Sequence, residues 1–261
     1  MNELVDIATK FPDLLKEIYC DLAKPGVSQV GKAIGGIVGL GNTALLPIHL
    51  VNEKARLYLE KNMNDYREQM QNQNENDVIE VTPEVGVPIL EKLAYVSNDE
   101  LSDMYINLLA KASTSAQVNQ AHPGFVKIID SLSPDEGLFL RKLQSQSSIP
   151  FIEIRLKYKG KTQWNTLADL VLSKAMLSGL SHPGNAPSYV SNLAALGILQ
   201  VRRDIWISPD TTYTTLWNQN NSRYAGIDAQ LKDRELTYEK GKIDITEFGA
   251  LFIRACFTKL T

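Results

Sequence analysis

Closely spaced helix-start signals between Thr82 and Leu143 are the feature that most constrains what this chain can fold into. Thr82-Pro83 matches an N-cap followed by proline at the first helical position. Ser97-Asn98-Asp99-Glu100 and Ser133-Pro134-Asp135-Glu136 both match the capping box, in which a Ser hydroxyl and a Glu carboxylate satisfy free backbone amides. Apolar residues recur at helical spacing after the first box, at Leu101, Met104, Tyr105, Leu108, Leu109 and Ala112. The stretch therefore predicts four short amphipathic helices around a shared core.

The composition indicates an ordinary globular protein with an uneven charge distribution. The chain has 261 residues, 44% of them hydrophobic, and a formal net charge of -3. Residues 1–148 carry 13 Lys/Arg against 20 Asp/Glu, whereas residues 149–261 carry 14 against 10, so we expect the two parts to face different partners or each other. Met1-Asn2-Glu3 is not the basic start of a secretory signal, which predicts a cytoplasmic protein. Cys20 and Cys256 are interpreted as reduced, buried hydrophobes.

Residues 27–51 form a glycine-rich apolar segment with two interpretations. Glycines recur every four residues, and the 19 residues from Ala33 to Val51 lack Asp, Glu, Lys and Arg, a length that would cross a bilayer core. Asn42, Pro47 and His49 argue for the other interpretation, a glycine-rich connector followed by a buried helix. The segment lacks the G-x-x-x-x-G-K-[ST] order of a phosphate-binding loop. The candidate membrane or partner contacts are Gly31, Gly35, Gly39, Leu45 and Leu46.

A long charged helix is predicted at residues 52–73, with one narrow apolar stripe. Such a stripe indicates packing against a partner helix, either in this chain or in a second copy, so self-association is one expectation. The polar stretch that follows is the best candidate linker. The predicted organisation is an N-terminal helical region at 1–78, a central helical core at 79–148 and a third domain at 149–261.

The C-terminal part mixes strands and helices. Residues 151–160 alternate apolar with charged side chains, which predicts a half-buried strand with a basic outer face. Thr166 with Asp169 is expected to begin a helix, and Pro187 to open another. Further strands are expected at 198–208, 213–217 and 242–246, before a closing helix. This order is typical of a winged-helix domain, so the predicted fold is mainly α with a smaller, winged-helix-like α+β part.

Winged-helix domains commonly bind DNA through the second helix of the pair, here residues 187–197. That helix carries no Lys or Arg, which counts against sequence readout because phosphate contacts dominate affinity. The candidate nucleic-acid contacts are therefore on the strands, at Lys157, Lys159, Arg202 and Arg203. A structural or protein-binding role for this domain is the other interpretation. Trp164, Trp206 and Trp217 are interpreted as core or interface residues.

No catalytic triad, phosphate loop or metal-ligand cluster occurs in the chain, so no catalytic, cofactor-binding or metal residue is predicted. His122 is interpreted as satisfying a backbone amide at a helix start, and Asn107 as a buried polar bridge between helices. Asp99, Glu100 and Asp103 lie at a helix start, where the dipole favours anions. A hydrolase would need scattered carboxylates such as Asp103, Asp130 and Asp135 to meet in one pocket.

Two motifs, LSDMYINLLA at 101–110 and HPGFVKIIDSLSP at 122–134, resemble the core of the abortive-infection alpha family of bacterial proteins. The resemblance covers residues 50–255, because the LGIL and ITEFG segments also look similar. It implies a role in phage defence through growth arrest or death of the infected cell, and it supplies no catalytic residues. We therefore expect a non-enzymatic phage-defence protein that acts through protein or membrane interaction, membrane-associated when activated. A winged-helix DNA-binding regulator is the alternative.

Overall fold

A computed structural model describes residues 30, 32–34, 53–224, 226–227 and 233–260. The chain divides into two compact units, one made of the residues up to Pro134 together with those from Leu251 onward, and the other of Asp135–Ala250. Residues of the predicted N-terminal region and of the predicted central core thus share the first unit. Its helices are α3 (Glu53–Met70), α4 (Pro83–Leu93), α5 (Asp99–Ala112), the 3-10 helix η1 (Val118–Gln120), α6 (Gly124–Asp130) and the end of α12 (Glu247–Phe257).

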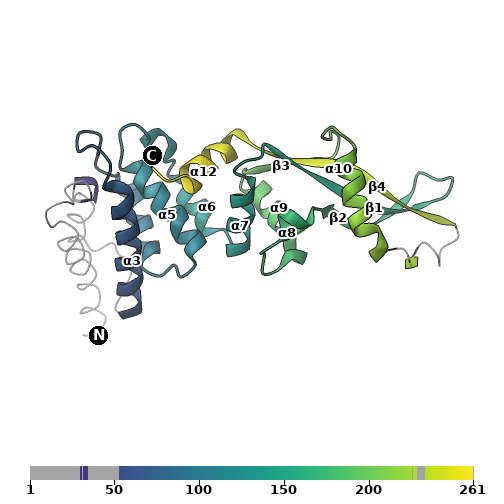
Figure 1. Cartoon of the computed structure of the whole chain (residues 1–261), viewed down its shortest axis with the longest axis horizontal. Helices are drawn as coiled ribbons and strands as arrows, with labels where there is room; N and C mark the ends of the chain where they lie inside the picture. The colour runs from purple at the N-terminus through teal and green to yellow at the C-terminus, as the bar shows by residue number, and fades with distance from the viewer. Residues whose placement is uncertain (1–29, 31, 35–52, 225, 228–232, 261) are drawn as a thin grey trace. The chain divides into compact units, whose positions relative to one another are not determined.

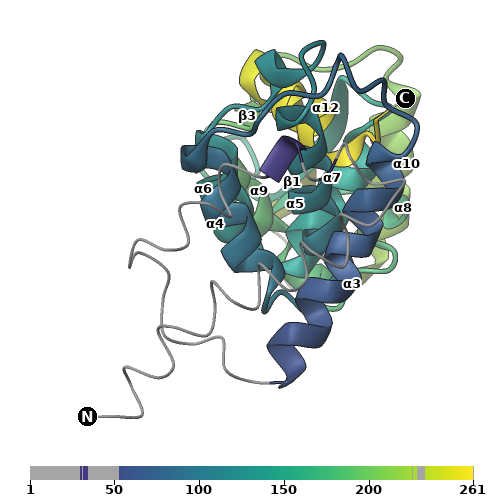
Figure 2. The same cartoon turned by 90° about the vertical axis from the view of Figure 1, so that its left-hand side faces the viewer.

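Helix α5 is the centre of the first unit, since α3, α4 and α6 all pack against it (Figures 1 and 2). The predicted helix at residues 52–73 is confirmed as α3, and its apolar stripe packs within the chain, burying Leu59, Met63, Tyr66 and Met70. The apolar periodicity predicted for α5 is also confirmed. The cap of α5 was predicted one residue too early, because Asn98 stands at the N-cap and its Oδ1 accepts from the Leu101 N–H at 3.1 Å.

Polar side chains of α3 bind its neighbours inside the core. Asn62 donates to the Leu93 carbonyl at the end of α4, 2.7 Å away, and the Tyr66 hydroxyl lies 2.6 Å from Ser113 Oγ after α5. Gln69 Nε2 donates to Asn107 Oδ1 at 2.8 Å, and Asn107 Nδ2 donates to the Cys256 carbonyl at 2.8 Å. Asn107 therefore joins α3, α5 and α12, which confirms the polar bridge predicted for it.

The second unit contains a four-stranded antiparallel sheet in the order β2-β1-β4-β3. Its α+β character agrees with the predicted fold class. The strands are β1 (Ser148–Tyr158), β2 (Trp164–Val171), β3 (Leu199–Arg202) and β4 (Arg234–Ile245), and the helices are α7 (Pro134–Leu143), α8 (Lys174–Leu177), η2 (Pro183–Asn185), α9 (Ala186–Ala195), α10 (Thr211–Asn220) and η3 (Asn221–Arg223).

The prediction of a helix starting at Thr166 was wrong, because this segment is the edge strand β2. Its register with β1 shifts twice, once between Ile152 and Ile154 and once between Ile154 and Arg155. Each shift inserts an extra residue into β2, as a β-bulge does. The bulges break the strict alternation of a strand and leave apolar residues at the three- and four-residue spacing that indicates a helix.

The prediction of a strand at residues 213–217 was also wrong, because this segment lies within α10. Tyr213 and Leu216, three residues apart, face the sheet and pack on Ile152 and Ile154. The predicted strand at 198–208 is only four residues long as β3, whereas the one predicted at 242–246 is the end of the much longer β4. The helix predicted from Pro187 is confirmed as α9.

Two glycines permit the closest backbone approaches in the second unit. A Cβ on Gly241 of β4 would lie 2.3 Å from the Phe151 ring and 2.8 Å from the Arg202 carbonyl oxygen. A Cβ on Gly249 would lie 2.2 Å from the Ile198 carbonyl oxygen. Both positions exclude any larger residue without backbone movement.

Asp135, in the first turn of α7, holds the segment before α9. Its carboxylate accepts from the backbone N–H groups of Ser181 and His182 and from the Tyr189 hydroxyl, each at 2.8 Å. Burial raises the pKa of Asp135, but the three donors outweigh burial and lower it below its usual value. The ionised form is therefore bound more strongly in the folded state than in the unfolded state.

We expect Asn107→Leu to lower the free energy of unfolding by about 2 kcal/mol, because the Cys256 carbonyl and the Gln69 amide would lose a buried partner. Urea unfolding measures the change. The matched control is Asn119→Leu, at an exposed amide of η1, which we expect to be close to neutral. Equal effects of the two substitutions would contradict the role given to Asn107.

We expect Lys111→Met to raise the free energy of unfolding at pH 7 by about 1 kcal/mol. The Lys111 side chain is only 2% exposed, its one hydrogen-bond partner among the described residues is Gln117 Oε1 at 2.8 Å, and burial lowers its pKa. A lowered lysine pKa costs stability while the amine is protonated, so the gain should shrink as pH rises toward the unfolded pKa of about 10.4. Urea unfolding at pH 7 and pH 10 measures this, with exposed Lys127→Met as the control.

We expect Asp135→Asn to lower the free energy of unfolding at pH 7 by about 2 kcal/mol, since an amide cannot accept from all three donors. A depressed carboxyl pKa stabilises the fold above the unfolded pKa of about 3.9, and this contribution is lost as pH falls through the folded pKa. The difference between wild type and variant should therefore narrow below about pH 4. Urea titrations at pH 7 and pH 3 measure this difference in the free energy of unfolding. A difference that is the same at both pH values would contradict the stabilising role of the ionised Asp135 carboxylate.

Candidate functional site

The first unit contains a polar cavity of about 680 Å³. Four carboxylates and one ammonium group line it, so the net charge of the lining favours cations. The remaining lining is mostly carboxamides from the end of α3 and the segment after it. The lining residues are Asp65, Glu68, Asp77, Asp103, Lys259, Gln69, Asn72, Gln73, Asn74, Ile106 and Leu260.

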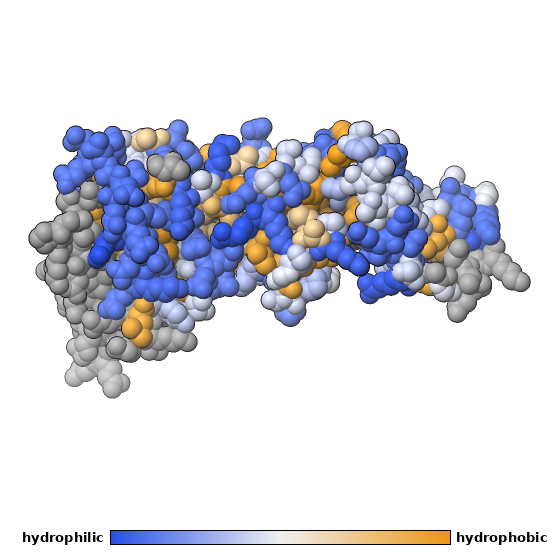
Figure 3. Space-filling model, viewed as in Figure 1, coloured by the Kyte–Doolittle hydropathy of each residue, from blue (hydrophilic) through white to orange (hydrophobic). Residues whose placement is uncertain are grey.

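Asp65 is the perturbed carboxyl group of this cavity. Burial raises its pKa, Lys61 lowers it, and the nearby charges of Glu68 and Asp103 raise it further, with a net upward shift. Lys61 itself pairs with Asp99 at 2.6 Å, at the start of α5. Figure 3 shows mainly hydrophilic residues on the face of α3 in view. Within the described ranges, no group of three or more His, Cys, Asp and Glu residues is arranged to hold a metal ion.

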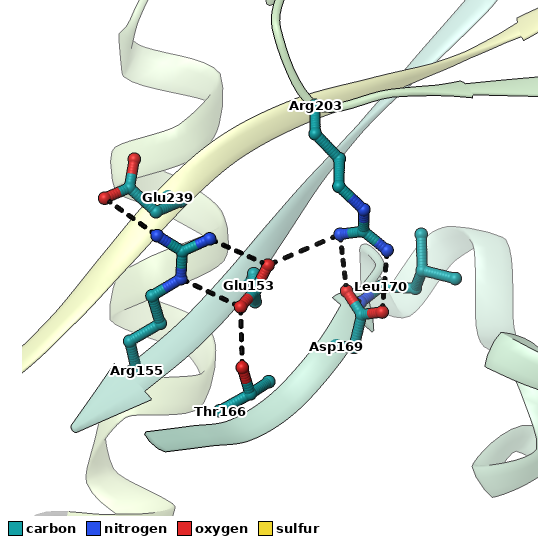
Figure 4. Close-up of polar contacts among 7 residues, drawn as sticks. All are labelled: Glu153, Arg155, Thr166, Asp169, Leu170, Arg203 and Glu239. Carbon is teal, nitrogen blue, oxygen red and sulfur yellow. Dashed lines mark hydrogen bonds and ion pairs between the residues drawn. The ribbon is translucent and has the colours of Figure 1, made fainter. Parts of the chain in front are cut away.

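The second unit has a dense polar cluster on its sheet, centred on Glu153 of β1 (Figure 4). Glu153 is only 8% exposed. Its carboxylate accepts from Arg155 Nε at 2.8 Å and Arg155 Nη2 at 3.1 Å, and from the Thr166 hydroxyl at 2.7 Å. The hydrogen bonds from Arg155 are the main reason that the pKa of Glu153 lies below its usual value.

Arg203, from the segment after β3, extends the cluster to the bulged end of β2. Its guanidinium donates to both Asp169 oxygens, at 2.8 and 2.7 Å, and lies 3.4 Å from Glu153 (Figure 4). Asp169 Oδ1 also accepts from the N–H of Leu170, whose φ of 50° lies in the left-handed region. The guanidiniums of Arg203 and Arg155 lie over the rings of Phe151 and Trp164, at 5.4 and 4.3 Å from the ring centroids.

This cluster is suited to fixing the sheet and poorly suited to proton transfer. A general base works best with a pKa near the working pH and a free lone pair facing the substrate. Glu153 has a depressed pKa, and its oxygens accept from Arg155, Thr166 and Arg203. The sequence interpretation placed Glu153 on a solvated face, because no local pattern reveals donors 13 and 50 residues away.

The predicted nucleic-acid contacts lie at two distant places on the sheet. Lys157 pairs in register with Glu235, and Arg202 with Lys242, so seven residues of β4, about 24 Å, separate them. Lys157 and Lys159 are exposed near the β1–β2 turn. Arg202 instead pairs with Asp204 at 2.9 Å, and Arg203 belongs to the Glu153 cluster.

The three carboxylates considered for a hydrolase have separate surroundings. Asp103 lines the cavity of the first unit. Asp130 accepts from the Tyr105 hydroxyl and lies 3.1 Å from Lys92 Nζ. Asp135 binds the segment before α9. His122 has the structural role predicted for it, since its Nδ1 accepts from the Gly124 N–H at 3.0 Å. Cys256 is buried, as predicted, and burial raises its thiol pKa.

The candidate membrane contacts, Gly31, Gly35, Gly39, Leu45 and Leu46, lie outside the described residues, as does Cys20. Across the residues that the structure describes, no helix combines the length and apolar character needed to span a membrane. The described start of the glycine-rich segment contacts the first unit. The Ala33 carbonyl accepts from the Val81 N–H at 2.8 Å, and Lys32 Nζ donates to the Glu75 carbonyl at 2.9 Å.

Comparison with known proteins gives one solved structure and one family. The solved structure is that of an uncharacterized protein from the hydrocarbon-degrading marine bacterium Alcanivorax borkumensis SK2, with 20% sequence identity and a TM-score of 0.32. The alignment covers 56% of this chain and 99% of that one. No curated protein matches the chain. The family model of abortive infection alpha matches residues 58–256, which include most of both units. The chain therefore belongs to the abortive infection alpha family.

Proposed function

We propose that this chain is a phage-defence protein that acts by binding a protein partner or a membrane and performs no chemistry of its own. The observation that carries the proposal is the family match over residues 58–256. The separate surroundings of Asp103, Asp130 and Asp135 support the non-enzymatic part. The cytoplasm is the compartment in which we expect it to act, and the protein partner includes a second copy of this chain.

We infer that the glycine-rich segment is the acting part and that it is held against the first unit before infection. Val30, Ala33 and Ile34 are buried, and the bonds to Val81 and Glu75 attach the described start of the segment to the chain between α3 and α4. The burial of these apolar side chains adds to the two hydrogen bonds, so the segment stays attached while the packing of the first unit is intact. We infer that its release needs a change in the first unit that disrupts this packing.

We also infer that the second unit is a winged-helix-like scaffold. The adjacent strands β1, β4 and β3 and the helices α7, α8 and α9 support this, with β2 as an added edge strand. Helix α9 carries no Lys or Arg, so we assign this scaffold a structural or protein-binding role.

Phage challenge of bacteria that express the chain tests the proposed function. We expect infected cells to stop growing or die early while phage yield falls, and dye entry to report membrane damage in the same cultures. Gly35→Leu should abolish the effect if the glycine-rich segment acts, because it blocks close backbone approach along the glycine strip. The control is Gly184→Leu in the second unit, where an added Cβ meets nothing within 4 Å.

Each outcome of this experiment tests a different part of the proposal. Unchanged phage yield with wild-type protein would overturn the defence role. Protection without dye entry would exclude membrane damage and leave a protein partner. Full protection by Gly35→Leu would mean that the defence activity does not depend on the glycine-rich segment. Lys32→Ala removes the bond to the Glu75 carbonyl, so we expect it to trigger growth arrest at lower phage dose.

A further inference from the structure

We propose that the polar cavity of the first unit binds a linear polyamine, a ligand such as spermidine in which protonated amines are joined by short methylene links. The cavity, of about 680 Å³, is lined by residues of α3, of the segment that follows it, of α5 and of the segment after α12. Helices α3 and α5 pack side by side in this unit (Figure 2). The ligand is a small molecule, which the proposed phage-defence function does not include.

The charges of the cavity are spread over several elements. Asp65 and Glu68 lie one turn apart on α3, about 4.5 Å along its axis, whereas Asp103 lies on α5 and Asp77 follows α3. Within the described ranges, no three such groups surround one point closely enough to hold a metal ion. Four negative carboxylates and the one positive ammonium of Lys259 leave three negative charges, equal and opposite to the charge of protonated spermidine. Separated carboxylates therefore favour a ligand whose positive charges are also separated.

Asp65 is a partly buried carboxylate that lacks a partner. In the part of the chain that the structure describes, its side chain forms no hydrogen bond and no ion pair. Lys61, one turn before it, is instead paired with Asp99 at 2.6 Å. Burial is the main reason that the pKa of Asp65 is raised, which agrees with the missing donor. The buried carboxylates of Asp135 and Glu153, in contrast, each accept from several donors of the chain. Asp65 therefore has acceptor capacity that an ammonium group from outside the chain would use.

An ammonium group of the chain itself already lies at the cavity. Lys259 lines the cavity, is exposed, and forms no ion pair with a described carboxylate. Its charge is one of those that lower the pKa of Asp65, so the two groups are close enough to attract each other. The lining therefore attracts an amine and leaves room beside Lys259 for further amines.

The rest of the lining matches the chemistry of a polyamine. Carboxamide oxygens accept hydrogen bonds from ammonium groups, and Ile106 and Leu260 offer apolar surface to the methylene links. No aromatic ring belongs to the described lining, so a quaternary ammonium ligand would lack its cation–π contacts. The carboxamides are those of Gln69, Asn72, Gln73 and Asn74.

Isothermal titration calorimetry of the full chain with spermidine at low salt tests the proposal. We expect one binding site, and Asp65→Asn should weaken binding about 10-fold because an ammonium loses a charged acceptor. The matched control is Glu80→Gln, which removes an exposed carboxylate of the same unit outside the cavity and should change the affinity by about 2-fold at most. Without ligand, Asp65→Asn should raise Tm, because a partly buried charge is removed. Thermal unfolding thus separates lost binding from lost folding.

Lys259→Ala should have the opposite effect on binding. Removing the positive charge from the lining should strengthen spermidine binding about 3-fold. Lys127→Ala removes an exposed lysine of the same unit outside the cavity and is the matched control. It should leave the affinity nearly unchanged.

Three results would overturn the proposal. The first is absence of spermidine binding, or equal affinity of wild type and Asp65→Asn, since any attraction would then come from the overall charge of the chain. The second is displacement of spermidine by an equal concentration of Mg²⁺, which would indicate a metal site. The third is tighter binding of a trilysine peptide, which would indicate a basic protein segment as the ligand. The titrations use purified chain without phage, so their outcome is independent of the proposed phage-defence function.

Discussion

The second unit depends on a buried carboxylate that cannot remain unpaired. Glu153 lies in the middle of β1, and isolated burial of its charge would cost several kcal/mol. Arg155, Thr166 and Arg203 remove that cost by donating to it from three elements. In satisfying Glu153, Arg203 also brings the segment after β3 onto Asp169 and fixes the bulge at Leu170. One buried charge thus determines the position of a loop and the irregular course of an edge strand.

The first unit uses the same principle with neutral groups. Asn107 is 4% exposed and binds α3 through Gln69 and α12 through the Cys256 carbonyl, so it attaches the end of the chain to a core formed about 150 residues earlier. Neutral bridges avoid the desolvation cost of charges and still demand one specific geometry. A hydrophobic residue at this position could pack in several orientations. The Asn107 amide, in contrast, fixes the relative positions of α3, α5 and α12 and also contributes to their stability.

Local patterns predicted the helices of the first unit well, because caps and apolar periodicity act within a few residues. Thr82-Pro83 and the Leu101 series found α4 and α5 within one or two positions. The sheet was predicted less well. Two bulges gave β2 an apparent helical period. The strand predicted at residues 213–217 lies within the helix α10, where Tyr213 and Leu216 pack on Ile152 and Ile154. The Glu153 cluster could not be predicted at all, since its donors Thr166 and Arg203 are 13 and 50 residues away and nothing local marks them as neighbours.

Counting charges in a sequence overestimates the positive surface that a fold presents. Residues 149–261 carry 14 Lys/Arg against 10 Asp/Glu, which suggested a basic strip that included Arg202 and Arg203. In the fold both arginines neutralise carboxylates, and guanidiniums committed to bidentate pairs have little remaining attraction for phosphate. Arg202 and Arg203 are therefore cations of this unit whose charge is already neutralised, although the sequence pointed to them as phosphate contacts. Ion pairing, which the composition does not reveal, decides which cations of a fold can attract an external anion.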